Sequence, residues 1–183
     1  MTRRYRHSLS IVFDRLDEDP MPKIIDRDKY KKDLAERAAG FFSKHGYAGV
    51  GMRGIAEHLG VSKSALYHYF PTKESLFLAS TESIMSRVGE APLDVATTES
   101  AQLLALVDSM RGDFGPEMAL VFDYLRGKSP TEIAADETMQ MSRSTYLKAV
   151  ERIVGPERAV ETLSVVIGRL MLDYLSGGEL GRL

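Results

Sequence analysis

Cysteine is absent from the 183-residue chain, which excludes disulfide bonds and thiolate metal sites. Long apolar runs are absent as well: none reaches the roughly 18 residues of a membrane-spanning helix. The N-terminal arginines precede no apolar segment long enough for a signal peptide. With 44% hydrophobic residues, the chain can form one or two small domains with a core. We therefore expect a globular, cytoplasmic protein without a membrane partner.

Groups that carry catalysis are also scarce. The four histidines, His7, His45, His58 and His68, lie in the first 70 residues, and no two have ligand spacing on one helix face. The rest of the chain has neither His nor Cys, which argues against a transition-metal site there. Neither a phosphate-binding glycine loop nor a Gly-X-Ser-X-Gly motif occurs. We expect no enzyme activity, no metal and no cofactor.

Charge is divided unevenly along the chain, although the net charge is only −2. Residues 1–75 contain 14 Lys and Arg against 10 Asp and Glu, whereas residues 76–183 contain 10 against 16. Nucleic-acid binding releases counterions from phosphates and so requires a basic surface. The basic half is therefore the half expected to contact such a partner.

Residues 46–76 have the pattern of a helix-turn-helix. Ile55, Ala56 and Leu59 share one face of a short helix, and Gly60 can adopt the positive φ of a sharp helix end. Ser62 is placed to cap a second helix, which Pro71 ends. In such a motif the second helix lies in the DNA major groove.

The second helix, residues 62–69, is expected to bury Leu66 and Phe70. Its other face then presents donors, a cation and an aromatic ring, as readout of DNA requires. Arg53, on the preceding helix, is a further candidate contact, with a solvated surface charge as the alternative. The candidate DNA-binding residues are Arg53, Ser62, Lys63, Ser64, Tyr67, His68 and Lys73.

Several short motifs in this segment resemble the DNA-binding domain of TetR-family transcriptional regulators. The matching motifs span about residues 28–78 and are Gly46-Tyr47, Ile55-Ala56, Gly60 to Lys63, Leu66 to Phe70 and Lys73-Glu74. The chain departs from the family at Val50-Gly51-Met52, where Thr or Ser is usual. The resemblance implies a homodimeric repressor that leaves its operator when an effector binds. It also implies that Tyr67 and Lys73 contact phosphate, which leaves Ser64 and His68 for base edges.

The remainder of the chain is predicted to be helical, giving an all-α protein of eight helices. We expect helices at 28–45, 53–59, 62–69, 73–87, 99–110, 115–126 and 130–154, and a last helix from Gly155-Pro156 to Gly177-Gly178. The expected domains are a helix-turn-helix domain at 28–72 and an effector-binding and dimerisation domain at 73–183. Residues 1–27 form an N-terminal extension. It is either a basic arm for the minor groove, or Met21 is the true start and residues 1–20 are not part of the natural protein.

Two further sites are predicted in the second domain. In the last helix, apolar residues spaced 3, 4, 3, 4 form a seam for a partner helix or for the protein's own core: Val160, Leu163, Ile167, Leu170 and Tyr174. A small apolar effector is expected between the helix at 73–87 and those at 99–110, 115–126 and 130–153. Its candidate contacts are Met85, Met110, Phe114, Met118, Phe122 and Tyr146, with Tyr124 or Tyr146 and Arg111 or Arg143 as polar anchors, although these can equally be core.

The function predicted is that of a sequence-specific regulator of transcription on a near-palindromic DNA site. One alternative is a DNA-binding regulator without an effector, acting through protein partners. The other is an all-α enzyme that contains a helix-turn-helix, which the lack of an acid–base or metal cluster disfavours.

Overall fold

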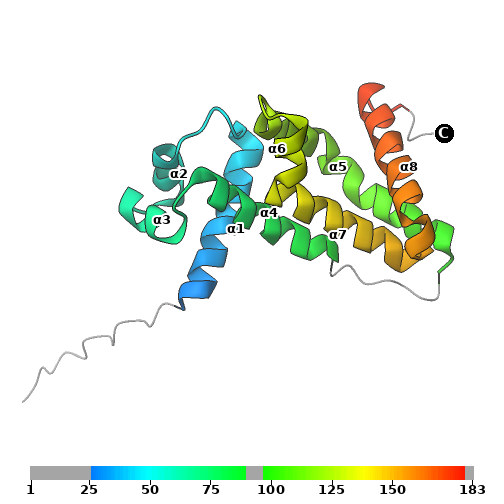
Figure 1. Cartoon of the computed structure of the whole chain (residues 1–183), viewed down its shortest axis with the longest axis horizontal. Coiled ribbons are helices and arrows are strands. Elements are labelled where there is room, and N and C mark those ends of the chain that lie inside the picture. Colours follow the sequence, from blue (N-terminus) through cyan, green and yellow to red (C-terminus); the bar gives the residue numbers. More distant parts are fainter. Residues whose placement is uncertain (1–25, 90–96, 180–183) are drawn as a thin grey trace, which may run out of the picture.

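The computed structural model describes residues 26–89 and 97–179, so the predicted N-terminal arm lies almost wholly outside the described residues. Every regular element in the described part is a helix, as predicted. Figure 1 shows helices α1 to α3 at one end of an elongated molecule and α8 at the other. The helices are α1 (Arg27–His45), α2 (Met52–Leu59), α3 (Lys63–Tyr69), α4 (Lys73–Gly89), α5 (Glu99–Leu125), α6 (Pro130–Ala135), α7 (Glu137–Val154) and α8 (Pro156–Leu175).

The helix-turn-helix forms where the local sequence predicts it. Gly60 ends α2 in the left-handed conformation, with φ of 70°. The Ser62 hydroxyl then accepts a 3.1 Å hydrogen bond from the Ala65 backbone N–H and caps α3. Ile55 and Leu66 are fully buried and hold α2 and α3 on α1. These cues act within one or two turns, so the segment forms from local sequence.

The expected break between helices at 99–110 and 115–126 is wrong, because α5 is continuous through Pro116. A proline normally forces the preceding residue out of the helical backbone conformation, because the proline ring collides with the Cβ of that residue. The preceding residue here is Gly115, which has no Cβ. The Tyr174 ring of α8 occupies that space, since a Cβ on Gly115 would lie 2.4 Å from Tyr174 Cε2.

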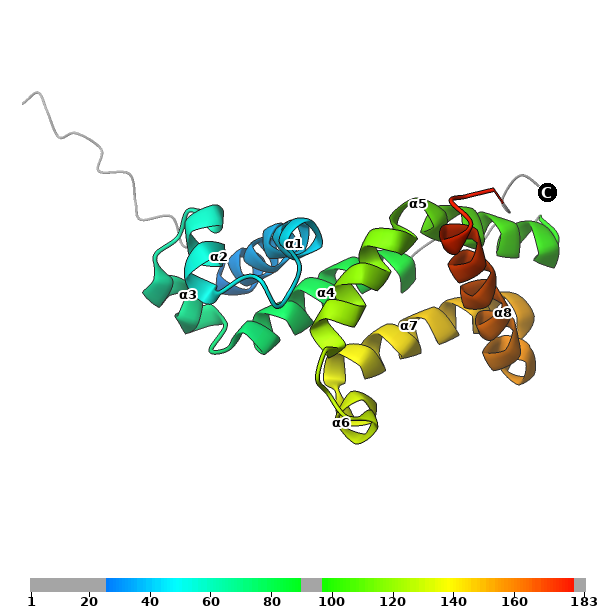
Figure 2. The same ribbon diagram turned by 90° about the horizontal axis from the view of Figure 1, so that it is seen from above.

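The single helix expected at 130–154 is also wrong, because it is divided at Asp136. The Ser129–Glu132 capping box begins α6 as predicted. Asp136 then leaves the helical conformation, and its carboxylate accepts a 3.1 Å hydrogen bond from the Met139 backbone N–H to cap α7. Ser142 to Ser144 lie within α7. Figure 2 shows α6 projecting sideways from the start of α7.

Helix α4 packs along α1 and also on α7, and so links the two ends of the molecule. Leu76 and Phe77 at its start are buried in the same core cluster as α1, α2 and α3. That cluster crosses the domain boundary expected at 72/73, which stays a prediction. Smaller clusters join α5 to α8 around Phe114 and α7 to α8 around Val150.

Candidate nucleic-acid interface and body cavity

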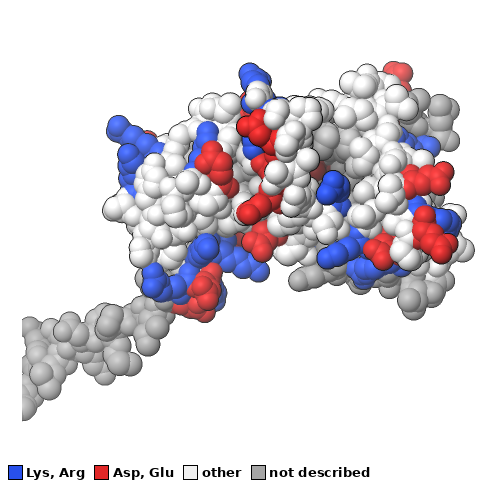
Figure 3. Space-filling model, in the orientation of Figure 1, with Lys and Arg blue, Asp and Glu red and all other residues white. Residues whose placement is uncertain are grey.

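Helix α3 presents the polar face that the sequence predicted. Its side chains on this face, Lys63, Ser64, Tyr67 and His68, are exposed, whereas Leu66 on the opposite side is fully buried. The Lys63 ammonium lies 5.6 Å from the Tyr67 ring centroid. Figure 3 shows Lys and Arg side chains at the end of the molecule that carries α2, α3 and the start of α1. A cationic, donor-rich face is therefore directed to solvent.

Arg53 and Arg27 border this face from the other helices of the domain. Arg53 is exposed and pairs with Glu57 one turn later at 3.0 Å. Arg27, at the start of α1, shares a hydrogen bond with the His68 ring. The sequence analysis did not single out Arg27, because the contact joins residues 41 positions apart and has no local signal.

Lys73 has a role that the sequence did not indicate. Its ammonium donates hydrogen bonds to the carbonyls of Tyr47 at 3.0 Å and Val50 at 3.1 Å. It also lies 4.1 Å from the Tyr47 ring centroid. Lys73 thus holds the loop between α1 and α2 against the start of α4, and at most one of its three N–H donors is left for a phosphate.

The loop between α1 and α2 is also joined, through α5, to the body of the molecule, by which we mean helices α4 to α8. The Asp123 carboxylate accepts hydrogen bonds from the backbone N–H groups of Tyr47 at 2.8 Å and Ala48 at 2.7 Å. These bonds lower the pKa of Asp123 because they favour the ionised form. The Tyr124 ring packs at 4.7 Å from Tyr47 and 4.4 Å from Phe77, between centroids.

Tyr124 is held in turn by a polar group at the junction of α6 and α7. Its hydroxyl donates a 2.7 Å hydrogen bond to the Asp136 carboxylate, which also forms an ion pair with Lys128. Burial raises the pKa of Tyr124, and its bond to Asp136 adds to this. Tyr124, expected as a ligand anchor, therefore belongs to the contact between the domains.

The body contains a largely apolar cavity of 270 Å³ between α4, α5 and α7, closed at one side by α8. Ligand pockets usually measure roughly 300–1,000 Å³. At 270 Å³ this cavity lies just below that range, so it suits only a small ligand. Its lining residues are Phe77, Thr81, Ile84, Met85, Glu117, Met118, Leu120, Val121, Met139, Ser142, Arg143, Tyr146 and Ile167.

Three of the six predicted ligand contacts line this cavity, namely Met85, Met118 and Tyr146. The other three do not. Phe114 is buried between α5 and α8 with Met110 packed beside it, and Phe122 is 61% exposed on the surface. Because α5 is one long helix, residues on either side of Pro116 face different neighbours.

The polar lining also differs from expectation. Arg143 lines the cavity, but Arg111 lies in another hollow, where its Nε is 3.6 Å from Asp173. Glu117, which no local sequence pattern singles out, faces the cavity together with Tyr146. Burial raises the pKa of Glu117, and the nearby charge of Asp113 raises it further. Burial also raises the pKa of Tyr146.

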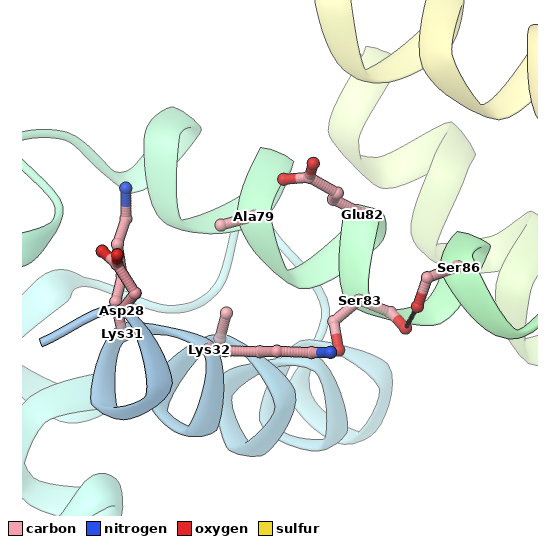
Figure 4. Close-up of a pocket in the computed structure, with 8 residues that line it drawn as sticks. Asp28, Lys31, Lys32, Ala79, Glu82, Ser83 and Ser86 are labelled. Carbon is pink, nitrogen blue, oxygen red and sulfur yellow. Dashed lines mark hydrogen bonds between the residues drawn. The ribbon is translucent and has the colours of Figure 1, made fainter. Parts of the chain in front are cut away.

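A second hollow, of 370 Å³, lies between α1 and α4 (Figure 4). Charges of both signs border it, Asp28 and Glu82 against Lys31 and Lys32. Figure 4 shows the Lys32 side chain extending across to Ser83 on α4. The mixed charge favours no class of ligand.

Most of the apolar seam predicted on α8 packs against the protein's own core and is not exposed to solvent. Leu170 is 2% exposed and packs on α5, and Leu163 and Ile167 also contact the core. Leu170 therefore has to be removed from the predicted dimer seam. The side of α8 that is exposed instead lies roughly 100° around the helix axis from the predicted seam, which is the rotation from one residue to the next. It carries Val160, Ser164, Gly168, Leu172 and Leu175.

Within the described residues, no helix is both long and apolar enough to cross a membrane. The same part of the chain has no cluster of three His, Cys, Asp or Glu side chains suited to a metal ion.

Known proteins match mainly the DNA-binding end. The profile of the bacterial regulatory proteins of the tetR family matches residues 34–80. The transcriptional regulator RutR of Escherichia coli is 37% identical over 81 residues, which cover 44% of this chain and 38% of RutR. The transcriptional repressor AcnR of Corynebacterium diphtheriae is 37% identical over 60 residues, 33% of this chain and 32% of AcnR. The matches thus span less than half of these relatives.

Among solved structures, AmtR of Mycobacterium smegmatis is similar with a TM-score of 0.39 and 23% identity, covering 82% of this chain and 78% of AmtR. A likeness of this degree supports no inference about ligands or assembly. The match at residues 34–80 falls on the helix-turn-helix described above, and the named relatives are regulators of transcription. Residues 34–80 thus form a DNA-binding domain of the kind found in the tetR family of bacterial regulatory proteins.

Proposed function

We propose that the protein is a homodimeric repressor that binds a near-palindromic DNA site and leaves it when a small effector enters the body cavity. The observation that carries the DNA-binding part is the exposed polar face of α3, supported from behind by Leu66. A helix presented in this way fits the major groove. The naming of AcnR as a repressor supports the direction of regulation. Operator binding places the protein in the cytoplasm.

The contacts on DNA divide into positioning and reading. Lys63, Arg53 and Tyr67 project charge or a hydroxyl at the edge of the face and are proposed to hold phosphates. Ser64 and His68 lie within the face and are proposed to contact base edges. The Arg27 guanidinium orients the His68 ring through its hydrogen bond.

Dimerisation is proposed through the exposed side of α8. Val160, Leu172 and Leu175 are 59–71% exposed there, next to the small residues Ser164 and Gly168. An exposed apolar stripe with small residues at its centre permits close packing of a second helix. Two copies joined in this way would present two α3 helices to successive major grooves.

Effector control is proposed to run along α4 and α5. Both helices line the cavity, through Met85 and Phe77 on α4 and Met118 on α5. Both also contact the loop between α1 and α2, α4 through Lys73 and α5 through Asp123. A ligand that displaces either helix therefore changes how the DNA-binding end is held, which is a coupling free energy between two sites.

The test is a titration of operator DNA, selected from random sequence, with the full chain in a gel shift. His68→Ala and Ser64→Ala should change the preferred sequence, whereas Lys63→Ala should weaken all sequences alike. A protein that binds no DNA duplex more tightly than random duplex contradicts the proposal. Binding that no small molecule reverses would favour the alternative, a regulator that acts through protein partners.

A further inference from the structure

The cavity between α4, α5 and α7 carries one carboxylate in a mainly apolar lining. Among the residues that the structure describes, Glu117 is the one acidic residue that faces it, and the walls also carry residues such as Met85, Met118 and Ile167. The side chains that α4 and α8 contribute are uncharged, and α7 contributes Arg143 and Tyr146. The polarity of the cavity is therefore concentrated on α5 and α7.

The negative charge of Glu117 has little local compensation. Tyr146 lines the cavity with it as a neutral donor, and the charged group that acts on its carboxylate is Asp113, which is also negative. Within residues 26–89 and 97–179 no ion pair joins Glu117 to Arg143 or to another cation. A partly buried carboxylate without a cationic partner is less favourable than one paired with a cation, so a cationic ligand would be stabilised there.

We propose that the effector is a small molecule with a positively charged amine at one end and an apolar body, and that Glu117 binds the amine. This inference rests on the proposed effector site and specifies its ligand. The cavity volume of 270 Å³ admits a single ring with a short chain. Phe77 and the three methionines, Met85, Met118 and Met139, provide an adaptable apolar wall for the body of the ligand.

An anionic ligand on Arg143 is the competing arrangement, and burial argues against it. Arg143 is exposed, so water already solvates its guanidinium, and an ion pair there gains little. Glu117 is largely buried, so an ion pair with it forms in a medium of lower dielectric constant.

The test uses three probes with one skeleton and different head groups: 4-phenylbutylammonium, 4-phenylbutanol and 4-phenylbutanoate. Isothermal titration of the full-length protein should give a Kd about tenfold lower for the ammonium than for the alcohol, as expected when a charge pairs with a buried carboxylate. Glu117→Gln retains a hydrogen-bond acceptor for Tyr146 and should abolish this preference. Asp113→Asn removes the same charge one turn earlier, outside the cavity lining, and should keep it.

Equal binding of the three probes, or preference for the carboxylate, overturns the cationic ligand. So does an ammonium preference that persists in Glu117→Gln. If none of the three probes binds, although each fits a cavity of 270 Å³, both this inference and the proposed effector site are overturned. The gel shift of the unliganded protein reports operator binding separately, so failure of the DNA-binding function is distinguished from failure of the ligand assignment.

Discussion

Asp123 accepts a 2.8 Å hydrogen bond from the backbone N–H of Tyr47, which ties the end of α5 to the loop that precedes α2. The same carboxylate oxygen accepts from Ala48 at 2.7 Å. Less than two turns earlier on α5, Glu117, Met118 and Val121 line the body cavity. One rigid helix thus contacts both the proposed ligand and the DNA-binding end.

Breaking this link should uncouple the two sites. In Asp123→Ala, operator binding without effector is expected to persist. The effector raises the operator Kd by some factor in the wild type, and this factor should be at least about fivefold smaller in the variant. Allosteric couplings span roughly 5–150-fold, so a loss of this size is measurable. Fluorescence anisotropy of labelled operator with and without effector measures this. Arg126→Ala is the control, because Arg126 contacts Asp123 at 3.4 Å from the exposed side without touching the loop. An unchanged effector response in Asp123→Ala would refute the link.

Glu117 should make stability depend on pH in an identifiable direction. Burial raises its pKa, so the folded state favours the protonated acid. The protonated Glu117 side chain therefore makes its full contribution to stability below its pKa in the unfolded chain, roughly 4.3. This contribution is lost as the pH rises through its higher pKa in the folded protein. Glu117→Gln should therefore raise Tm at pH 7, on the order of 2 °C, and the gain should disappear near pH 4. Thermal unfolding by circular dichroism tests this; a gain that is independent of pH would contradict it.

Two substitutions on α8 should separate the surface from the core. Leu172 is 59% exposed on the proposed dimer face, so Leu172→Asp should give a folded monomer. Leu170 is 2% exposed against α5, so Leu170→Asp buries an unpaired charge and should cost roughly 3 kcal/mol or more of stability. Light scattering gives the mass and thermal unfolding gives the stability. A Leu172→Asp protein that remains dimeric would move the interface away from this side of α8.

Two lysines at the DNA-binding end should behave differently. Lys63 is exposed, so Lys63→Ala should reduce affinity for all sequences and lower the salt dependence by about one unit per α3, with no change in Tm. Lys73 donates to two backbone carbonyls, so Lys73→Ala should in addition lower the stability by about 1–3 kcal/mol. Anisotropy titrations at several salt concentrations, paired with thermal unfolding, distinguish the two. Equal Tm values for both variants would show that the contacts of Lys73 contribute little.

The sequence by itself determined the helix-turn-helix and the ends of most helices. Ile55, Gly60 and Ser62 act through periodicity, backbone conformation and capping, all of which operate within a turn or two of the residue concerned. The exposed face of α3 follows from the same local pattern, since the burial of Leu66 fixes which side is free. The α6 capping box at Ser129 was readable for the same reason.

Only the tertiary structure decided which faces meet. Helix α5 continues through Pro116 because Gly115 has no Cβ to collide with the proline, and the ring of Tyr174, far along the chain, packs in the space beside Gly115. On α8, apolar residues occupy more than one side, so the spacing of Leu170 could not show whether it faces the protein or a partner. The bond between Asp123 and Tyr47 joins residues 76 positions apart, and the isolation of Glu117 in an apolar cavity arises from three helices together. Such contacts depend on the packing of whole helices, which no local pattern encodes.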